Sequence, residues 1–214
     1  MNNALLIVDI QNDFCPGGAL PVPEGDRIVP AINRLMHTQL FQKVAATKDW
    51  HPPGHTSFAS RYGKEVYTTT DTPYGPQILW PDHCIQGTWG AEFHPALESG
   101  LIRQVVYKGI DPEIDSYSTF FDNARLQQTG LHAYLQDAGV TELYLAGLAT
   151  DYCVLFSSLD ALELGYRVTV IEDCCRGVDV RPGDCQMALA KIVAAGGRVT
   201  SSQEFFNSRK EERR

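Results

Sequence analysis

Residues 142–165 read ELYLAGLATDYCVLFSSLDALELG, and this stretch contains the unit from which the fold is built. Apart from Glu142, its first five residues are apolar, which is typical of a buried strand. Leu155, Leu159 and Leu162 then recur at helical spacing until Gly165 ends the pattern. A buried strand followed by an amphipathic helix predicts a parallel sheet, because parallel strands need long crossover connections.

The same alternation extends outward in both directions along the chain. Besides 142–146, strands are predicted at residues 4–8, 43–47, 104–107 and 166–171, with an edge strand at 198–201. Helical patterns occupy residues 28–36, 131–138, 155–162 and 187–193. The sequence therefore predicts an α/β fold of three layers, with a mainly parallel, doubly wound sheet covered by helices on both faces. The 214 residues show no internal repeat and fit a single domain, 1–214.

The composition excludes several classes of protein. The chain has 18 Lys and Arg against 26 Asp and Glu, a net charge of −8, so its average field repels nucleic acid. No apolar run approaches the roughly 18 residues of a membrane span, and no basic segment before Ala4 indicates a signal peptide. Six cysteines without a CxxC pair fit reduced thiols, so a cytoplasmic protein is expected. A charged, frayed tail is predicted after about residue 206, with a diluted basic cluster of Arg209, Lys210, Arg213 and Arg214.

Two long connections interrupt the alternation. Residues 51–103 hold six of the twelve prolines and four of the six histidines, without a clear helical pattern. Residues 109–130 form the second connection. Long irregular loops within a compact domain are usually functional. Both connections are therefore predicted to be walls of a pocket, and residues 51–103 are predicted to be an insertion that carries a metal site.

Polar residues follow the predicted strands directly. Asp9 follows the first strand, Asp49 the second and Lys108 the third, while Cys153 lies about one turn beyond the fourth. Ligands of open α/β sheets bind at these carboxyl ends. The carboxyl end of the sheet is therefore the candidate active site.

Cys153 is the candidate nucleophile at this end of the sheet. In the segment LATDYC it falls in the first turn of a helix, where free N–H groups and the helix dipole predict a lowered thiol pKa and an oxyanion site. Asp9 would take its proton, and Lys108 would stabilise the thiolate. A structural cysteine beside an Asp9–Lys108 ion pair is the alternative, and these residues alone leave both interpretations open.

A metal centre is the second candidate site. Asp49 and His51 stand two residues apart and point the same way in an extended chain, and His83 is the best third ligand. Two histidines and one carboxylate suit Zn, Fe or Mn, although a short DxH pair alone is more often structural. His55 is close enough to approach the ion. The other histidines are expected to be ordinary surface or helix residues: His37, His94 and His132.

Five segments, in order, resemble one known family. They are ALLIVDIQNDFCPGGAL at 4–20, ATKDWHPPGH at 46–55, WPDHCIQGTWGAEFHP at 80–95, VYKGIDPEIDSYSTFFDN at 106–123 and LAGLATDYCV at 145–154. With them the chain resembles the nicotinamidases, also called pyrazinamidases, of the isochorismatase-like cysteine hydrolases. Only the residues after about 206 lie outside the resemblance.

The resemblance implies a role for each candidate residue. It makes Cys153 the nucleophile, Asp9 the proton shuttle and Lys108 the third member of the triad. It also implies three further sets: metal ligands Asp49, His51 and His83; an oxyanion hole from the N–H groups of Ala149 and Cys153, after a cis Leu148–Ala149 peptide bond; and pocket aromatics Phe14, Trp80 and Tyr117.

The implied reaction converts nicotinamide to nicotinate and ammonia through a Cys thioester, as a step of NAD salvage, with pyrazinamide as a further substrate. One divalent metal ion would bind the ring nitrogen, with zinc the first candidate and iron or manganese the alternatives. Two other functions stay open: a carbamoyl or ureido amidohydrolase with the same triad, and a metal or thiol sensor that uses Cys174 and Cys175. Neither the native metal nor the oligomeric state follows from the sequence.

Overall fold

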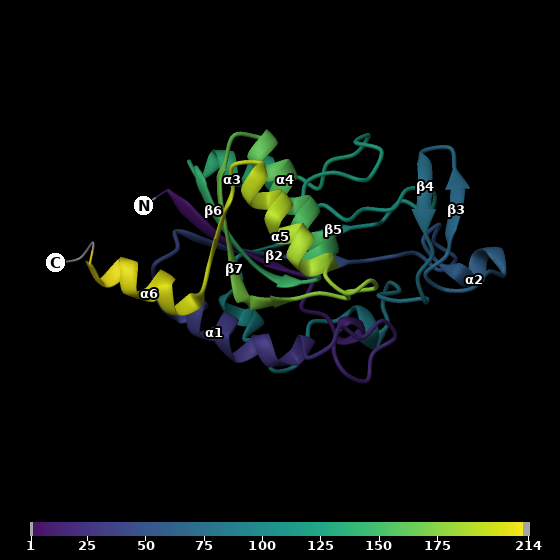
Figure 1. Ribbon diagram of the computed structural model, residues 1–214, viewed down its shortest axis with the longest axis horizontal. Coiled ribbons are helices and arrows are strands. Elements are labelled where there is room, and N and C mark those ends of the chain that lie inside the picture. Colours follow the sequence, from purple (N-terminus) through teal and green to yellow (C-terminus); the bar gives the residue numbers. More distant parts are fainter. Residues whose placement is uncertain (1, 212–214) are drawn as a thin grey trace.

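Six parallel strands form the central sheet of the computed structural model, which describes residues 2–211 (Figure 1). Their order across the sheet is β5 (Gln104–Lys108), β2 (Lys43–Asp49), β1 (Asn3–Val8), β6 (Glu142–Leu148), β7 (Arg167–Arg176) and β8 (Arg198–Thr200). The chain winds from β1 through β2 to β5 and then returns to the centre, where β6 pairs with β1. The predicted α/β fold with a doubly wound parallel sheet is confirmed. Its switch point, where ligands bind in such sheets, lies at the carboxyl ends of β1 and β6.

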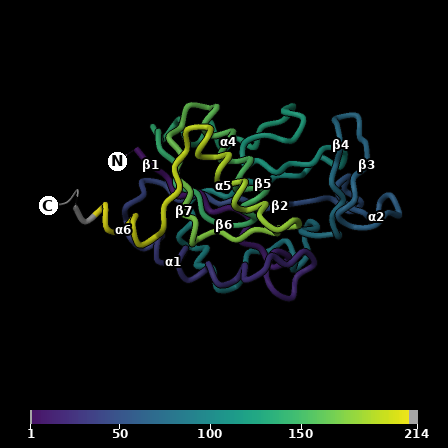
Figure 2. Tube along the Cα trace, viewed as in Figure 1, coloured from purple at the N-terminus to yellow at the C-terminus, as the bar shows by residue number. Residues whose placement is uncertain are grey.

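Helices cover both faces of the sheet and enclose two cores (Figures 1 and 2). Leu5 and Ile7 of β1 enter one core, together with residues of α1 (Val29–His37) and α6 (Ser202–Glu211). Ala4 and Leu6 enter the other, which is closed by α3 (Leu131–Asp137), α4 (Leu155–Glu163) and α5 (Asp184–Ala194). All of β1 is buried because its alternate side chains point into opposite cores.

The long connection between β2 and β5 leaves the sheet at the end where the strands terminate (Figure 1). It contains the four-residue helix α2 (Ala59–Tyr62) and a hairpin of β3 (Thr69–Thr72) and β4 (Gly75–Ile78), which the sequence analysis does not predict. Short 3-10 turns, η3 (Trp89–Ala91) and η4 (Ser99–Leu101), complete it. β3 is rich in threonine, and Gly75, which follows the turn, has φ +112°. Both features are usual in a β-hairpin.

The end of the chain differs from the predicted frayed tail, because α6 continues to Glu211. Phe205 anchors this helix by stacking on Phe41, with ring centroids 5.5 Å apart. Arg209 donates a hydrogen bond to the hydroxyl of Tyr144, so this basic residue is packed against the sheet. Arg213 and Arg214 lie outside the described residues.

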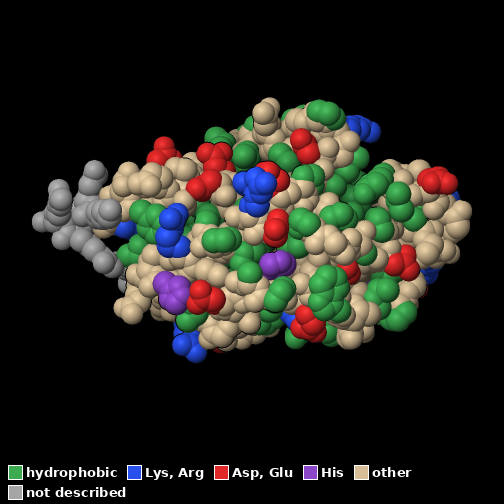
Figure 3. All heavy atoms as spheres, turned by 90° about the horizontal axis from the view of Figure 1, so that it is seen from below, with side chains coloured by type: hydrophobic (Ala, Val, Ile, Leu, Met, Phe, Trp, Pro, Cys, Tyr) green, Lys and Arg blue, Asp and Glu red, His purple; other side chains and the backbone are tan. Residues whose placement is uncertain are grey.

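Two global features accompany this architecture. Within residues 2–211, no helix combines the length and the apolar character that a membrane crossing requires. On the face shown in Figure 3, acidic and basic side chains are interspersed rather than gathered into one area of a single charge.

Candidate active site

Four polar side chains meet at the carboxyl end of the sheet. Asp9 follows β1, Asp49 ends β2, Lys108 ends β5 and Cys153 follows β6, and none of them is more than 6% exposed. Asp49 and Lys108 are direct partners in the register of β2 and β5. The structure thus brings together the residues that the strand ends single out in the sequence.

The ammonium group of Lys108 is the centre of this cluster. Its Nζ lies 2.9 Å from Asp9 Oδ2 and 3.3 Å from Cys153 Sγ, and it also contacts Asp49 Oδ1. The other carboxylate oxygen of Asp9 accepts a hydrogen bond of 2.6 Å from the hydroxyl of Thr47. One cation therefore holds the thiol and both carboxylates within reach of one another.

Burial sets the protonation states in the cluster. Burial raises the pKa of the Cys153 thiol well above its usual value, against the opposing effect of Lys108. It also raises the pKa of Asp9, again against the effect of Lys108. Burial alone would lower the pKa of Lys108, but Asp49 and Asp9 raise it overall. The direction of the Cys153 pKa shift is thus opposite to the predicted lowering, because burial outweighs the effect of Lys108.

The segment after β6 presents Cys153. The Leu148–Ala149 peptide bond is cis, and the next residues form η5 (Thr150–Val154), a π-helical turn that precedes α4. Cys153 thus lies in the first helical turn after β6, as predicted, and this turn is π-helical and continues directly into α4. Gly147, at φ +133°, allows β6 to approach β1, because a Cβ there would lie 2.1 Å from the carbonyl oxygen of Val8.

A second cluster lies beside the first and shares Asp49. Possible ligand atoms of Asp49, His51 and His83 all lie within 4.8 Å of one another. The Nε2 atoms of His51 and His83 are 3.6 Å and 3.9 Å from Asp49 Oδ2. Their Nδ1 atoms lie 2.9 Å from the carbonyl oxygen of Gly109 and 2.7 Å from that of Pro81. Such outer contacts fix both rings with Nε2 toward the carboxylate, as at metal centres.

Two further histidine observations bear on this cluster. Burial and the neighbouring His51 lower the pKa of His83 to about 4, so its imidazole is neutral at neutral pH. His55 stacks on His51 with centroids 4.2 Å apart and groups with His51 and Asp115, rather than with Asp49 and His83. The other three histidines have partners elsewhere: His37 with Glu98, His94 with the Ala96 N–H group, and His132 with Tyr166.

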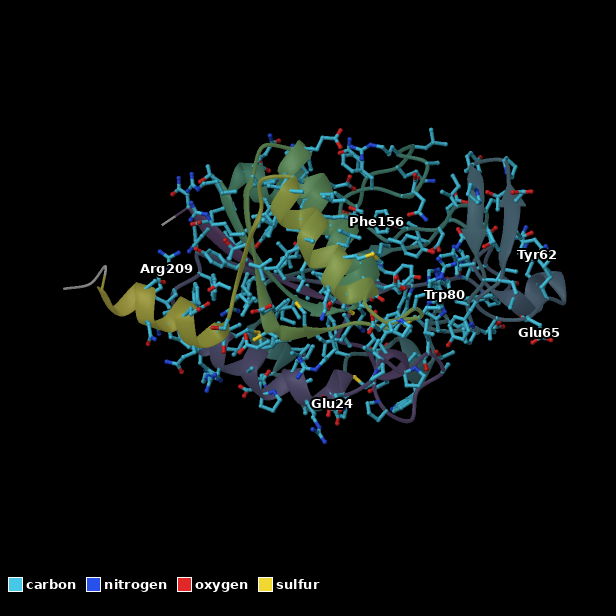
Figure 4. The ribbon with its side chains drawn as sticks, in the orientation of Figure 1. Glu24, Tyr62, Glu65, Trp80, Phe156 and Arg209 are labelled. Atoms are coloured by element: carbon cyan, nitrogen blue, oxygen red, sulfur yellow. The ribbon has the colours of Figure 1, made fainter. Side chains whose placement is uncertain are left out.

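A cavity lies where the two clusters meet. It is lined by Cys153, by all three members of the histidine and carboxylate set, and by a mostly apolar wall of Phe14, Leu20, Trp80, Tyr117, Ala149, Tyr152 and Val178, together with Asp115. Trp80 lies toward the β3–β4 hairpin (Figure 4), and Phe156 of α4 packs against Tyr117 with ring centroids 5.3 Å apart. The Trp80 indole N–H donates to the Tyr117 hydroxyl at 3.2 Å, which fixes two of the predicted aromatic residues.

Sequence reasoning missed several residues of this cavity. Leu20, Tyr152 and Val178 line it without having been singled out as site residues, whereas Asp115 comes from the connection 109–130 that was predicted to be a pocket wall. The side chain of Gln11 also escaped notice, although it brackets the backbone of Asp49, accepting from its N–H and donating to its carbonyl, both at 2.8 Å. Tyr152 had a usable signal, since it is adjacent to Cys153 in the turn.

Known proteins share this arrangement of the chain. Residues 3–204 match the family model described as Isochorismatase domain. The chain is 52% identical over 198 residues to a nicotinamidase of Escherichia coli (strain K12), covering 92% of this chain and 93% of the relative. A solved structure, "Acinetobacter baumanii nicotinamidase pyrazinamidease", has a TM-score of 0.91 at 42% identity, covering 95% of this chain and 98% of that chain.

A pyrazinamidase of Pyrococcus horikoshii, solved in complex with zinc, has a TM-score of 0.76 at 35% identity, covering 94% of this chain and 99% of that chain. These similarities confirm the resemblance inferred from the sequence segments.

Proposed function

The chain belongs to the isochorismatase family, and on this premise we propose that it is a nicotinamidase, a hydrolase that converts nicotinamide to nicotinate and ammonia. One observation carries the proposal: a single cavity is lined both by the buried thiol of Cys153 and by the set Asp49, His51 and His83. Nicotinamide offers a matching group to each, a carboxamide carbon for the thiol and a ring nitrogen for a metal. The flat apolar walls suit an aromatic ring.

The side chains present fit a divalent cation. Asp49 Oδ1 contacts Lys108, while Oδ2 faces the Nε2 atoms of both histidines. Two imidazoles and one carboxylate suit zinc, iron or manganese, and we favour zinc because a related pyrazinamidase was solved with it. A bound cation would offer an open coordination position to the lone pair of the ring nitrogen.

The triad supplies the covalent chemistry. Cys153 Sγ attacks the carboxamide carbon while its proton passes to Asp9, and the N–H groups of Ala149 and Cys153 receive the developing oxyanion. Asp9 then protonates the amide nitrogen, the C–N bond breaks, and ammonia leaves a nicotinoyl thioester on Cys153. Water then attacks the thioester carbon while Asp9 accepts one of its protons; the C–S bond breaks, nicotinate leaves after losing the second proton to solvent, and Asp9 returns its proton to the Cys153 sulfur. Lys108 keeps Asp9 and the sulfur in place and stabilises the transient thiolate.

The same geometry ranks the other candidates. Pyrazinamide keeps both the carboxamide and a ring nitrogen, so we propose it as a second substrate. A carbamoyl or ureido substrate would leave the histidine set without a partner, and a sensor based on Cys174 and Cys175, both buried in β7, would leave the triad without a role. A cytoplasmic location, which fits the six free cysteines, is part of the proposal.

Ammonia release from nicotinamide tests the proposed function. Purified protein is expected to release ammonia rapidly, to lose this activity after dialysis against a chelator, and to regain it when zinc, iron or manganese is added back. Release that persists after proven removal of the metal would contradict the metal part of the proposal. Absence of release with every metal would contradict the nicotinamidase assignment itself.

The variant His83→Ala is expected to weaken metal binding by at least about tenfold, since it removes one of three ligands and leaves the triad intact. KM for nicotinamide should rise with the loss of metal. Metal content measured by atomic absorption, beside KM, checks both effects. His132→Ala is the matched control, because His132 pairs with Tyr166 away from the cavity. An unaltered metal stoichiometry in His83→Ala would remove His83 from the ligand set.

Benzamide tests the contact to the ring nitrogen. It has the size and the carboxamide of nicotinamide but lacks the nitrogen lone pair, so an ordered ligand contact would be lost. We expect its affinity to fall by about tenfold or more in the metal-loaded protein. The metal-free protein should bind both compounds equally. For the metal-loaded protein, affinity is measured as the inhibition constant of benzamide against nicotinamide hydrolysis. For the metal-free protein, it is measured by calorimetry on Cys153→Ala. Equal affinity of the two compounds for the metal-loaded protein would exclude the contact.

A further inference from the structure

A carboxylate outside the two clusters ties together the segments on which they are built. Asp13 lies in η1 (Asn12–Phe14), the turn after β1, and is 8% exposed. Its Oδ2 accepts a hydrogen bond of 2.7 Å from the N–H group of Cys84, which lies 71 residues away in the chain. Its Oδ1 accepts one of 3.0 Å from Ala19 in its own loop. Both oxygens of a buried carboxylate are thus used to fix backbone groups.

The surrounding chain is shaped to admit this carboxylate. A Cβ on Gly90 would lie 2.0 Å from Asp13 Oδ2, so the absence of a side chain there makes the space that the carboxylate fills. The neighbouring Asn12 donates from its side chain to the carbonyl of Trp89 at 2.7 Å. The turn after β1 is therefore fastened to residues 84–90 at more than one point.

The backbone of Cys84, whose N–H group Asp13 holds, is the link between the two candidate histidine ligands. Cys84 directly follows His83, and its carbonyl oxygen accepts the N–H of His51 at 3.0 Å. Cys84 has φ +47°, in the left-handed region that residues with a side chain seldom adopt without support. Its N–H and C=O groups are both engaged, one by Asp13 and the other by His51.

We propose that Asp13 is a positioning residue of the metal centre. Its carboxylate holds the Cys84 peptide in its left-handed conformation, which sets the direction of the His83 imidazole and its separation from His51. Phe14, the next residue, packs on the His83 ring with centroids 5.5 Å apart, so the same turn supports the ring from a second side. This proposal rests on the proposed metal site. Asp13 contributes to the metal affinity of that site although it touches no metal-ligating atom.

Two variants reach this carboxylate by different routes. Asp13→Asn replaces one acceptor oxygen with an amide donor, which cannot accept from a backbone N–H. Gly90→Ala leaves Asp13 intact but places a methyl group where its carboxylate lies. Each is expected to weaken zinc binding by about 10- to 100-fold, the usual effect of removing an outer contact of a metal ligand. Competition with a chromophoric chelator measures the affinity, and the visible spectrum of the Co²⁺-loaded protein reports the ligand geometry.

Each variant has a matched control. Asp122 is also a buried aspartate whose carboxylate accepts two backbone N–H groups, those of Leu126 and Gln127, at 3.0 Å and 2.8 Å. Gly100 is a glycine at which a Cβ would meet nothing within 4 Å. Asp122→Asn and Gly100→Ala should bind zinc within about twofold of the parent and give the parent Co²⁺ spectrum, since an outer contact is not removed in either.

The outcomes separate this inference from the proposed function. A parent protein that binds no metal would overturn both. If the parent binds metal, the positioning role is supported when folded Asp13→Asn or Gly90→Ala shows weaker zinc binding and an altered Co²⁺ spectrum. The controls should show neither change. Parent-like affinity in either folded variant overturns it. Failure of both variants to fold, with both controls folded, also overturns it, because Asp13 would then serve the fold as a whole.

Discussion

Cys153→Ala is expected to lower kcat for nicotinamide hydrolysis by about 10⁴-fold or more, because the covalent intermediate forms on this sulfur. The metal content should be unchanged, since the proposed ligands Asp49, His51 and His83 all remain. Ammonia release measures the loss. Mass spectrometry of acid-quenched protein should find the nicotinoyl adduct on the parent and none on the variant.

Cys174→Ala controls for the removal of a buried thiol. Cys174 is fully buried in β7 and belongs to the core closed by α1 and α6. We expect its kcat/KM to stay within about threefold of the parent, in the range of changes remote from the site. A Cys153→Ala protein with more than about a tenth of the parent activity would show that the thiol is not the nucleophile.

The arrangement of the sheet could be predicted because its strands carry their signal locally. Each central strand is buried on both faces, so it reads as an unbroken apolar run, and the polar residue after it marks its carboxyl end. Asp9 and Asp49 could be located in this way without any knowledge of tertiary contacts, and Lys108 follows the shorter apolar run of the edge strand β5. The β3–β4 hairpin lacks this signal, since most of its residues are not fully buried. Gln77 of β4 is fixed by Asp115, 38 residues away, at 2.8 Å.

The rest of the site depends on contacts that no local pattern contains. Val178 and Leu20 reach the cavity from loops whose sequences are not distinctive, and the contact of Asp13 with Cys84 joins residues 71 positions apart. The direction of the Cys153 pKa shift differs from the prediction for a similar reason. The turn itself favours a thiolate, but the burial of the sulfur and the presence of two carboxylates depend on the assembled site.

Lys108→Met should have the second large effect, on both activity and stability. Methionine replaces the apolar stem of lysine as far as Cε but removes the ammonium that lies between Asp9, Asp49 and Cys153. The two carboxylates would then face each other and the thiol in a buried site without a cation. Loss of one member of a buried ion pair costs about 3–5 kcal/mol, and we expect a fall of this size in the free energy of unfolding measured with urea. The transient thiolate also loses its counter-charge, so kcat should fall by about 10³-fold or more.

Lys48→Met separates these effects from the general cost of removing a buried lysine. Lys48 lies on β2 and is 6% exposed, but its partner Glu92 has a side chain that is 55% exposed. The carboxylate left behind can therefore be solvated, and the expected loss of stability is only about 1 kcal/mol, with kcat/KM within about threefold of the parent. If Lys108→Met lost stability but kept kcat, Lys108 would be a structural ion-pair residue. If it lost neither stability nor kcat, the buried ammonium would have no part in the site. Another group would then have to hold Asp9 beside Cys153 for the proton transfer.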